Sequence, residues 1–251
     1  MPRESKQARL SRMHQEYAVL CEEIPHPKCA LNFSNPFELL VATVLSAQTT
    51  DKRVNMVTPE LFGEYPGPAA LASANPEHVE SIIHSIGFHH TKAKNIIGLS
   101  YALCERFDGE VPQTMDALTS LPGVGRKTAN VVLGNAFGVP GFPVDTHVIR
   151  VTGRLRWRSD WASGSPDPKA IEREITACFP PEEWTDLSHR LILHGRAICH
   201  ARKPDCLNCP LNDTCPSAHS QRNAHARCSL CQLDSAPWKT PWKKKTGGKP
   251  S

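Results

Sequence analysis

The stretch 121-LPGVGRKTA-129 places two glycines and two cations between apolar runs, a composition that suits an anion-binding turn. It does not fit the Walker phosphate-binding pattern, because Arg126 separates Gly125 from Lys127 and no glycine stands at the required place upstream. Helical spacing on both sides predicts two helices joined by a tight turn over 114–137. Backbone N–H groups in such a turn can bind a nucleic-acid phosphate, with a purely structural turn as the alternative. The residues expected to meet the phosphate are Gly123, Val124, Gly125 and Arg126.

Two titratable residues lie where they could do chemistry. Lys127 falls in the first turn of the second helix, where the helix dipole disfavours an ammonium and favours the neutral amine, the nucleophilic form. Asp145 directly precedes an apolar-periodic helix, and capping that helix would explain it fully. From spacing alone, an exposed helix lysine and a capping aspartate remain the structural alternatives to catalysis.

Four cysteines have the spacing C-x6-C-x2-C-x5-C. The N-terminus lacks the apolar core of a secretory signal, so we expect a reducing compartment, where clustered thiolates indicate zinc or an iron–sulfur cluster rather than disulfides. The run has a single Cys-x-x-Cys knuckle, whereas zinc ribbons use two, and it does not match common ferredoxin spacings either. Arg202 and Lys203, between the first two cysteines, are candidate phosphate contacts. The four candidate metal ligands are Cys199, Cys206, Cys209 and Cys215.

The elements that must position these residues are predicted to be helices. In 35–48 apolar residues recur at helical spacing along one face, and Asn35, Pro36 and Glu38 mark the start of the helix by capping. Because no alternating strand pattern occurs, the fold class is all-α. Similar helical patterns occupy about 8–23, 51–62, 76–85, 91–107, 125–137, 145–156, 168–178 and 184–199.

The composition of the 251 residues is that of a globular protein, with 39% hydrophobic and 22% charged residues and no apolar run long enough to span a bilayer. The net charge of +4 comes from the C-terminal end, since Ser217 onward holds seven Lys or Arg and one acid. The segment 217–251 is therefore predicted to be a basic, disordered tail, in which Cys228 and Cys231 have no defensible ligand spacing. The thiols expected in or near the core are Cys21, Cys29, Cys104 and Cys178.

Several motifs, in order along most of the chain, resemble the endonuclease III family of helix-hairpin-helix DNA glycosylases. This resemblance implies a two-lobed all-α fold, with a helix-hairpin-helix lobe at 29–139 and a second lobe formed by 1–28 and 140–216. The motifs are LPGVGRKTA, 36-PFELLVATVLSAQTTD-51, 86-IGFHHTKAKNI-96, 109-GEVP-112, 144-VDTHV-148, 191-LILHGR-196 and the cysteine run.

The resemblance also implies roles for the residues above. The lysine of this motif attacks C1′ of the damaged nucleotide and forms a Schiff base that leads to β-elimination, which assigns Lys127. The VDTH motif holds the essential aspartate of the family, which corresponds to Asp145 here. Its carboxylate would face the sugar. The four cysteines would hold a 4Fe-4S cluster, and zinc is the alternative.

A glycosylase must extrude its target nucleotide and fill the gap. By resemblance, Gln48 is the glutamine that does this, and the second wedge falls in 86–93. There Phe88 stands where many relatives have leucine, and His89 adds aromatic bulk. Lys92 is an expected phosphate contact, as is Lys94.

The resemblance implies a bifunctional DNA glycosylase and abasic-site lyase of base excision repair that acts on oxidised pyrimidines in duplex DNA. We expect a monomer without membrane contact, located in the cytoplasm at the nucleoid if the source is bacterial. One alternative is a monofunctional adenine or thymine mismatch glycosylase, although Thr43 replaces the glutamate of the adenine enzymes and Lys127 is present. The other is a non-catalytic iron–sulfur protein that binds DNA or senses redox state.

Overall fold

A computed structural model describes residues 4–218, and within them the chain is helical with no strand, which confirms the all-α prediction. The long predicted helices all form, with ends that differ by a few residues. The short helix α4 was not predicted. The α-helices are α1 (Lys6–Glu23), α2 (Pro36–Leu45), α3 (Asp51–Glu64), α4 (Pro68–Ala72), α5 (Pro76–Ile82), α6 (His89–Phe107), α7 (Met115–Thr119), α8 (Arg126–Phe137), α9 (Thr146–Arg154), α10 (Pro168–Thr176) and α11 (Trp184–Ala197), with 3-10 turns at Pro181–Glu183 and Cys206–Asn208.

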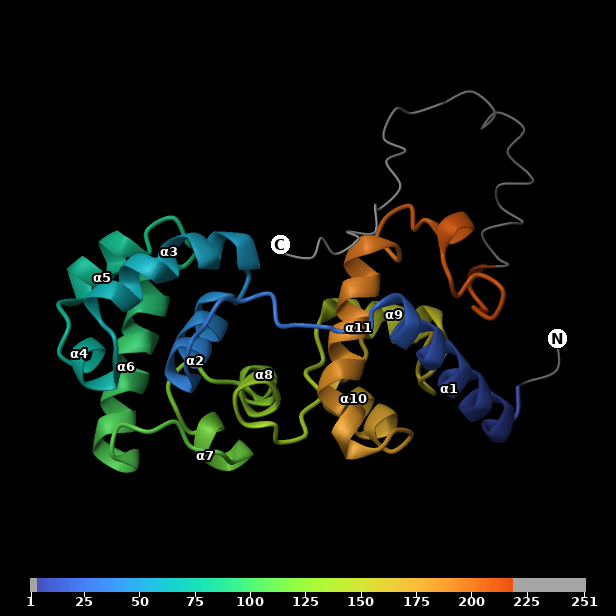
Figure 1. The fold of residues 1–251 in the computed structure, drawn as a ribbon, viewed down its shortest axis with the longest axis horizontal. Coiled ribbons are helices and arrows are strands. Elements are labelled where there is room, and N and C mark those ends of the chain that lie inside the picture. The colour runs from blue at the N-terminus through green and yellow to red at the C-terminus, as the bar shows by residue number, and fades with distance from the viewer. Residues whose placement is uncertain (1–3, 219–251) are drawn as a thin grey trace, which may run out of the picture.

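The helices pack around two separate hydrophobic cores, which form two lobes side by side (Figure 1). Helices α2 to α8 enclose the first core, and α1 with α9, α10 and α11 encloses the second. The chain crosses between the lobes twice, at 24–35 and at 138–145. The cleft where the lobes meet is therefore built from residues far apart in sequence.

Helix α2 is the centre of the first lobe. Asn35 caps it by accepting a hydrogen bond from the Glu38 N–H at 2.9 Å, as predicted. The Glu38 carboxylate reaches back to the N–H of Ser34 at 2.7 Å, one residue before the cap. The periodicity predicted one buried face, but all of residues 39–45 are buried. The reason is that neighbouring helices cover α2 on every side.

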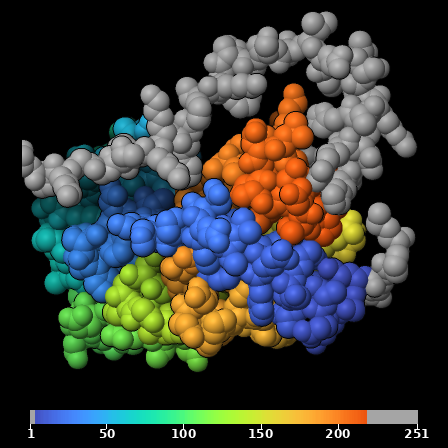
Figure 2. All heavy atoms as spheres, turned by 45° about the vertical axis from the view of Figure 1, so that its right-hand side comes forward, coloured from blue at the N-terminus to red at the C-terminus, as the bar shows by residue number. Residues whose placement is uncertain are grey.

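Helix α1 crosses to the second lobe because its apolar residues Met13, Tyr17 and Leu20 join that core, beside the fully buried Trp157. Figure 2 shows this helix, in deep blue, packed beside the orange segment that carries the cysteine run. Among residues 4–218, no helix is both long and apolar enough to cross a membrane. The predicted tail, with Cys228 and Cys231, lies outside the described residues from 219 onward.

Candidate active site

The turn before α8 has the backbone geometry of an anion site. Gly123 has a φ of +74°, and a Cβ there would lie 2.9 Å from the Asn95 side chain, so only glycine fits. Gly125 caps α8 without a side-chain hydrogen bond. The Ala129 N–H donates to the Gly125 carbonyl at 3.0 Å and is the first to find a partner within the helix. The N–H groups of residues 126–128 are therefore left for an outside acceptor.

Two side chains of this turn are engaged with the protein. Val124 is buried in the first core. Arg126 forms a bidentate ion pair with Glu172 of α10, with Nε 2.7 Å from Oε2 and the second nitrogen 2.9 Å from Oε1. This guanidinium therefore joins the two lobes and is not free to bind an outside anion while the ion pair is formed.

Lys127 and Asp145 line one cleft of about 80 Å³ at the junction of the lobes. Lys127 is exposed, and its amine has no hydrogen bond or ion pair within residues 4–218. Asp145 caps α9 as predicted, with Oδ1 accepting from the N–H groups of His147 and Val148, both at 2.8 Å. Its Oδ2 has no hydrogen bond within the same residues. One carboxylate oxygen is thus structural, and the other makes no hydrogen bond within the described residues.

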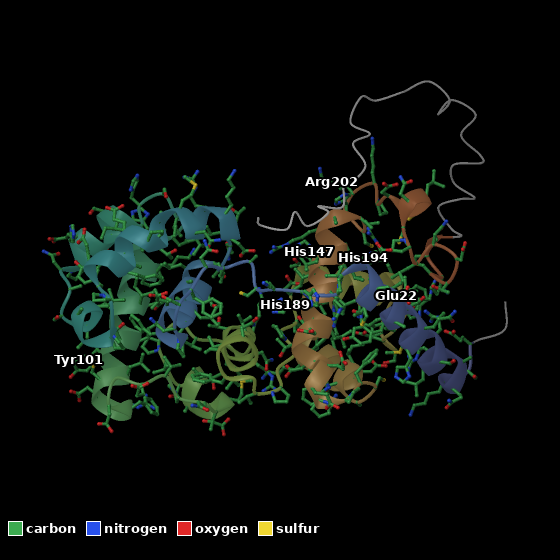
Figure 3. All side chains as sticks on the ribbon, viewed as in Figure 1. Glu22, Tyr101, His147, His189, His194 and Arg202 are labelled. Atoms are coloured by element: carbon green, nitrogen blue, oxygen red, sulfur yellow. The ribbon has the colours of Figure 1, made fainter. Side chains whose placement is uncertain are left out.

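Sequence reasoning missed three residues in the walls of this cleft. Arg196 of α11, in the second lobe, forms an ion pair with Asp51 of α3, in the first lobe, at 2.7 Å. This pair bridges the two walls of the cleft. His189 is buried, which lowers its pKa, and its Nε2 lies 2.8 Å from the Asn135 amide oxygen. Figure 3 shows His189 and His147 beside the boundary between the lobes. No single-residue pattern marks Asp51, His189 or Arg196, because their partners are distant in sequence.

The cleft adjoins a groove of about 970 Å³, with which it shares Ala30, Asp51 and Arg196. Gln48 lies in the groove wall, exposed, with a φ of +53°. Phe88 has a φ of +60° and is 68% exposed. A left-handed backbone at two exposed residues that are not glycine is uncommon and costs energy, so the surrounding structure must hold both in place.

The four cysteines of the run line one enclosed pocket beneath α9 and α11. Apolar side chains form part of its wall, and burial raises the pKa of Cys209 to about 12. The Arg154 guanidinium donates to the Cys199 Sγ at 3.2 Å and to the His200 carbonyl at 2.6 Å. The pocket thus offers four thiols, one of which already faces a fixed cation, and suits a group that binds thiolates.

The separation of the sulfur atoms bears on which group fits. A tetrahedral zinc site with Zn–S bonds of 2.3 Å needs sulfur atoms about 3.8 Å apart. Within residues 4–218, no three of these sulfur atoms lie within 4.8 Å of one another. The arrangement therefore suits a larger, multinuclear group better than a single zinc ion.

The loop between the first two cysteines holds the remaining predicted cations. Arg202 and Lys203 are exposed, and Lys203 has a φ of +49°. Figure 3 shows Arg202 at the outer edge of the second lobe. His89, predicted near the duplex, is half-buried at the start of α6.

The sequence and the fold are similar to those of known DNA repair proteins. The model of the HhH-GPD superfamily base excision DNA repair proteins matches residues 41–181. Endonuclease III of Synechocystis sp. is 49% identical over 203 residues, which cover 80% of this chain and 90% of that protein. The chain belongs to the endonuclease III family. The resemblance drawn from the sequence motifs is confirmed.

Two solved structures are similar to the whole two-lobed fold. One is a non-covalent endonuclease III–DNA complex and the other a trapped endonuclease III–DNA covalent intermediate. Each has a TM-score of 0.78 and 41% sequence identity, and each match covers 84% of this chain and 98% of the solved chain. The similarity therefore extends across both lobes.

In this endonuclease III homologue, Lys92 does not lie where it was expected. It is only 5% exposed, and its ammonium donates to the carbonyls of Leu45 and Ala47 at 2.9 and 2.7 Å and to the Thr49 hydroxyl at 2.9 Å. The prediction of a phosphate contact is wrong, because all three ammonium donors are used inside the protein. Lys92 instead ties α6 to the end of α2 and so links the segments that carry Phe88 and Gln48.

Replacing Lys92 with methionine is expected to lower the free energy of unfolding by about 2–4 kcal/mol, because two carbonyls and a hydroxyl lose their donor. Urea denaturation followed by circular dichroism measures the change. Lys94→Met, on the exposed side of the same helix, is the matched control and should stay within about 0.5 kcal/mol of wild type. Equal stabilities for the two variants would contradict the role given to Lys92.

Proposed function

We propose that this chain is a bifunctional DNA glycosylase and abasic-site lyase that removes oxidised pyrimidines from duplex DNA. The observation that carries the proposal is the amine of Lys127, which lies in one cleft with Asp145 and has no partner among residues 4–218. It is supported by 41% identity to an endonuclease III that has been trapped as a covalent DNA intermediate. The substrate places the enzyme at the chromosome, which in a bacterium is the cytoplasmic nucleoid.

The chemistry begins with the neutral amine of Lys127. Its Nζ forms a bond to C1′ of the damaged nucleotide as the bond from C1′ to the base breaks, and the base leaves with the bonding electron pair. Loss of a proton from Nζ and opening of the sugar ring give a Schiff base. Removal of a proton from C2′ then breaks the C3′–O bond and cuts the strand.

Asp145 assists this sequence through the carboxylate oxygen that does not cap α9. A fixed negative charge beside the sugar stabilises the positive charge that develops at C1′ as the base departs. The same carboxylate can accept a proton from the lysine ammonium and so supply the nucleophilic amine. Because Oδ1 is held by two backbone N–H groups, Oδ2 is kept in place for both tasks.

DNA binding is proposed to use the features around the cleft. The backbone N–H groups of residues 126–128, directly after the turn at Gly123 and Gly125, receive a phosphate. Gln48 and Phe88, both exposed and both with a left-handed backbone, enter the duplex where the nucleotide has left, with His89 beside them. Arg202 and Lys203, in the cysteine loop of the second lobe, contact the phosphate backbone of the DNA. Such contacts weaken as the salt concentration rises.

We assign a 4Fe-4S cluster to the pocket lined by the four cysteines, on the basis of the thiol set and its wide sulfur spacing. Cys199, Cys206, Cys209 and Cys215 would each supply one thiolate. A bound cluster would hold together the segment 199–215, which includes the loop that carries Arg202. Base excision requires no electron transfer, so the cluster would have a structural role. Arg154 would neutralise part of the charge on the Cys199 sulfur.

Anaerobically purified protein is expected to hold about four iron atoms per chain and to show the broad visible absorbance of such a cluster. Cys209→Ala should lose both signals, whereas Cys104→Ala, a thiol outside the pocket, should keep them. Stoichiometric zinc without iron in the wild type would contradict the assignment.

The function is tested on a duplex with a single thymine glycol. The wild type is expected to release the base and cut the strand, and to leave adenine and thymine mismatches intact. Base release that leaves an uncut abasic strand would identify a monofunctional glycosylase. Tight binding without release would identify a non-catalytic DNA-binding protein.

A further inference from the structure

A second group of metal-type ligands lies in the first lobe, away from the cysteines. Glu80 of α5 and His89 and His90 of α6 have ligand atoms that all lie within 4.8 Å of one another, and no other trio of this kind occurs in the described part of the chain. The His90 Nδ1 is 2.5 Å from the Glu80 Oε2, and the two imidazole rings are 4.1 Å apart between centroids. The DNA-repair chemistry above gives Glu80 and His90 no task, and it uses His89 only as bulk beside the duplex.

Two imidazoles and one carboxylate select a particular class of cation. Imidazole nitrogen suits zinc and its neighbours in the first transition row, whereas magnesium and calcium prefer oxygen alone. Zinc bonds of 2.0–2.2 Å in a tetrahedron put donor atoms about 3.3–3.6 Å apart. The three donors lie within 4.8 Å of one another, so each has to move by about 1 Å to reach that spacing. The His90 side chain is 75% exposed and has room to rotate.

The backbone brings the three ligands together. Phe88 adopts a left-handed conformation just before α6, and the two residues that follow it open the helix beside the end of α5. His78 and Glu64 form a similar ion pair at 2.5 Å in the same lobe, but no third ligand accompanies them. That pair is an internal comparison, because two ligands without a third bind a metal ion weakly.

We propose that Glu80, His89 and His90 bind a divalent transition-metal ion of the zinc class, with water completing the coordination. Metal binding replaces the hydrogen bond between His90 and Glu80 by two bonds to the ion. The bound ion would join α5 to the first turn of α6 and close the segment 81–88, at the end of which Phe88 lies. The site takes no part in the bond-breaking steps proposed for Lys127 and Asp145, although it adjoins the segment proposed to enter the duplex.

The test is a calorimetric titration of Zn²⁺ into the cluster-loaded full chain. The wild type should show a binding step that Glu80→Gln and His90→Asn each weaken by about tenfold or more, since loss of a ligand costs at least as much as loss of an outer partner. Glu77→Gln, on the same helix, and His78→Asn, which removes the two-ligand pair, should leave the step unchanged. All these side chains are exposed or half-buried, so the variants fold.

Free thiols elsewhere in the chain also bind zinc, but their contribution is the same in every variant. The proposal is overturned if wild type, Glu80→Gln and His90→Asn give identical isotherms. A second readout is the ring ¹⁵N chemical shifts of His89 and His90. Both are expected to shift with one equivalent of Zn²⁺, and unchanged shifts would also refute the site.

Discussion

Lys127→Ala is expected to yield no covalent adduct when the protein is reduced with borohydride on a duplex with an abasic site, whereas the wild type is trapped. The amine of Lys127 lines the cleft and has no partner within the described residues, so it is available to attack C1′. Removing the amine proposed to form the Schiff base should reduce strand cleavage on the order of 10³-fold or more. Gel electrophoresis of the trapped complex measures the loss directly.

Lys28 provides the matched control, because it is also an exposed lysine that lines the same cleft. Lys28→Ala should be trapped as well as the wild type. Loss of the adduct in Lys28→Ala, with Lys127→Ala still trapped, would reassign the nucleophile. Both proteins should keep the absorbance of the cluster, which shows that the second lobe is intact.

Asp145→Asn is expected to separate capping from catalysis. Asparagine caps helices as well as aspartate does, so its amide oxygen can accept the same N–H groups of His147 and Val148 and stability should change by about 0.5 kcal/mol or less. The negative charge beside the sugar is lost, which should slow base release by about 10²–10⁴-fold. Single-turnover kinetics on the thymine glycol duplex measure the rate.

Asp167 is the matched control for Asp145, since it caps α10 through the N–H groups of Lys169 and Ala170. Asp167→Asn should keep both stability and rate. Asp145→Ala, by contrast, should lose about 0.5–2 kcal/mol as well as activity. Full activity in Asp145→Asn would return this residue to a purely structural role.

The helices and their caps were predictable because their causes are local. Apolar residues at helical spacing set the elements, and Asn35 and Asp145 accept hydrogen bonds from N–H groups two or three residues after them. The family motifs located Lys127, Asp145 and the cysteine run in the same way, through residue types at short spacings.

Helical periodicity alone would have placed Lys92 on the buried face of α6. Lys92 precedes Ile96, Leu99 and Leu103 by four, seven and eleven residues, so it lies on the buried face of α6, whereas Lys94 lies on the exposed side. The pattern therefore indicated burial. The three acceptors at the end of α2 could not be foreseen, because they are more than 40 residues away in sequence.

The sequence by itself determined the helices, the reactive residue types and the family of this protein, since each follows from neighbours a few positions apart. Only the tertiary structure decided which charged groups remain free. Arg126 is paired with Glu172 and Arg196 with Asp51, in each case across the boundary between the lobes, while the Lys127 amine has no partner in the part of the chain that the structure describes. Whether a charged side chain is available depends on the elements that fold against it. The spacing of residues along the chain does not predict which distant elements these are.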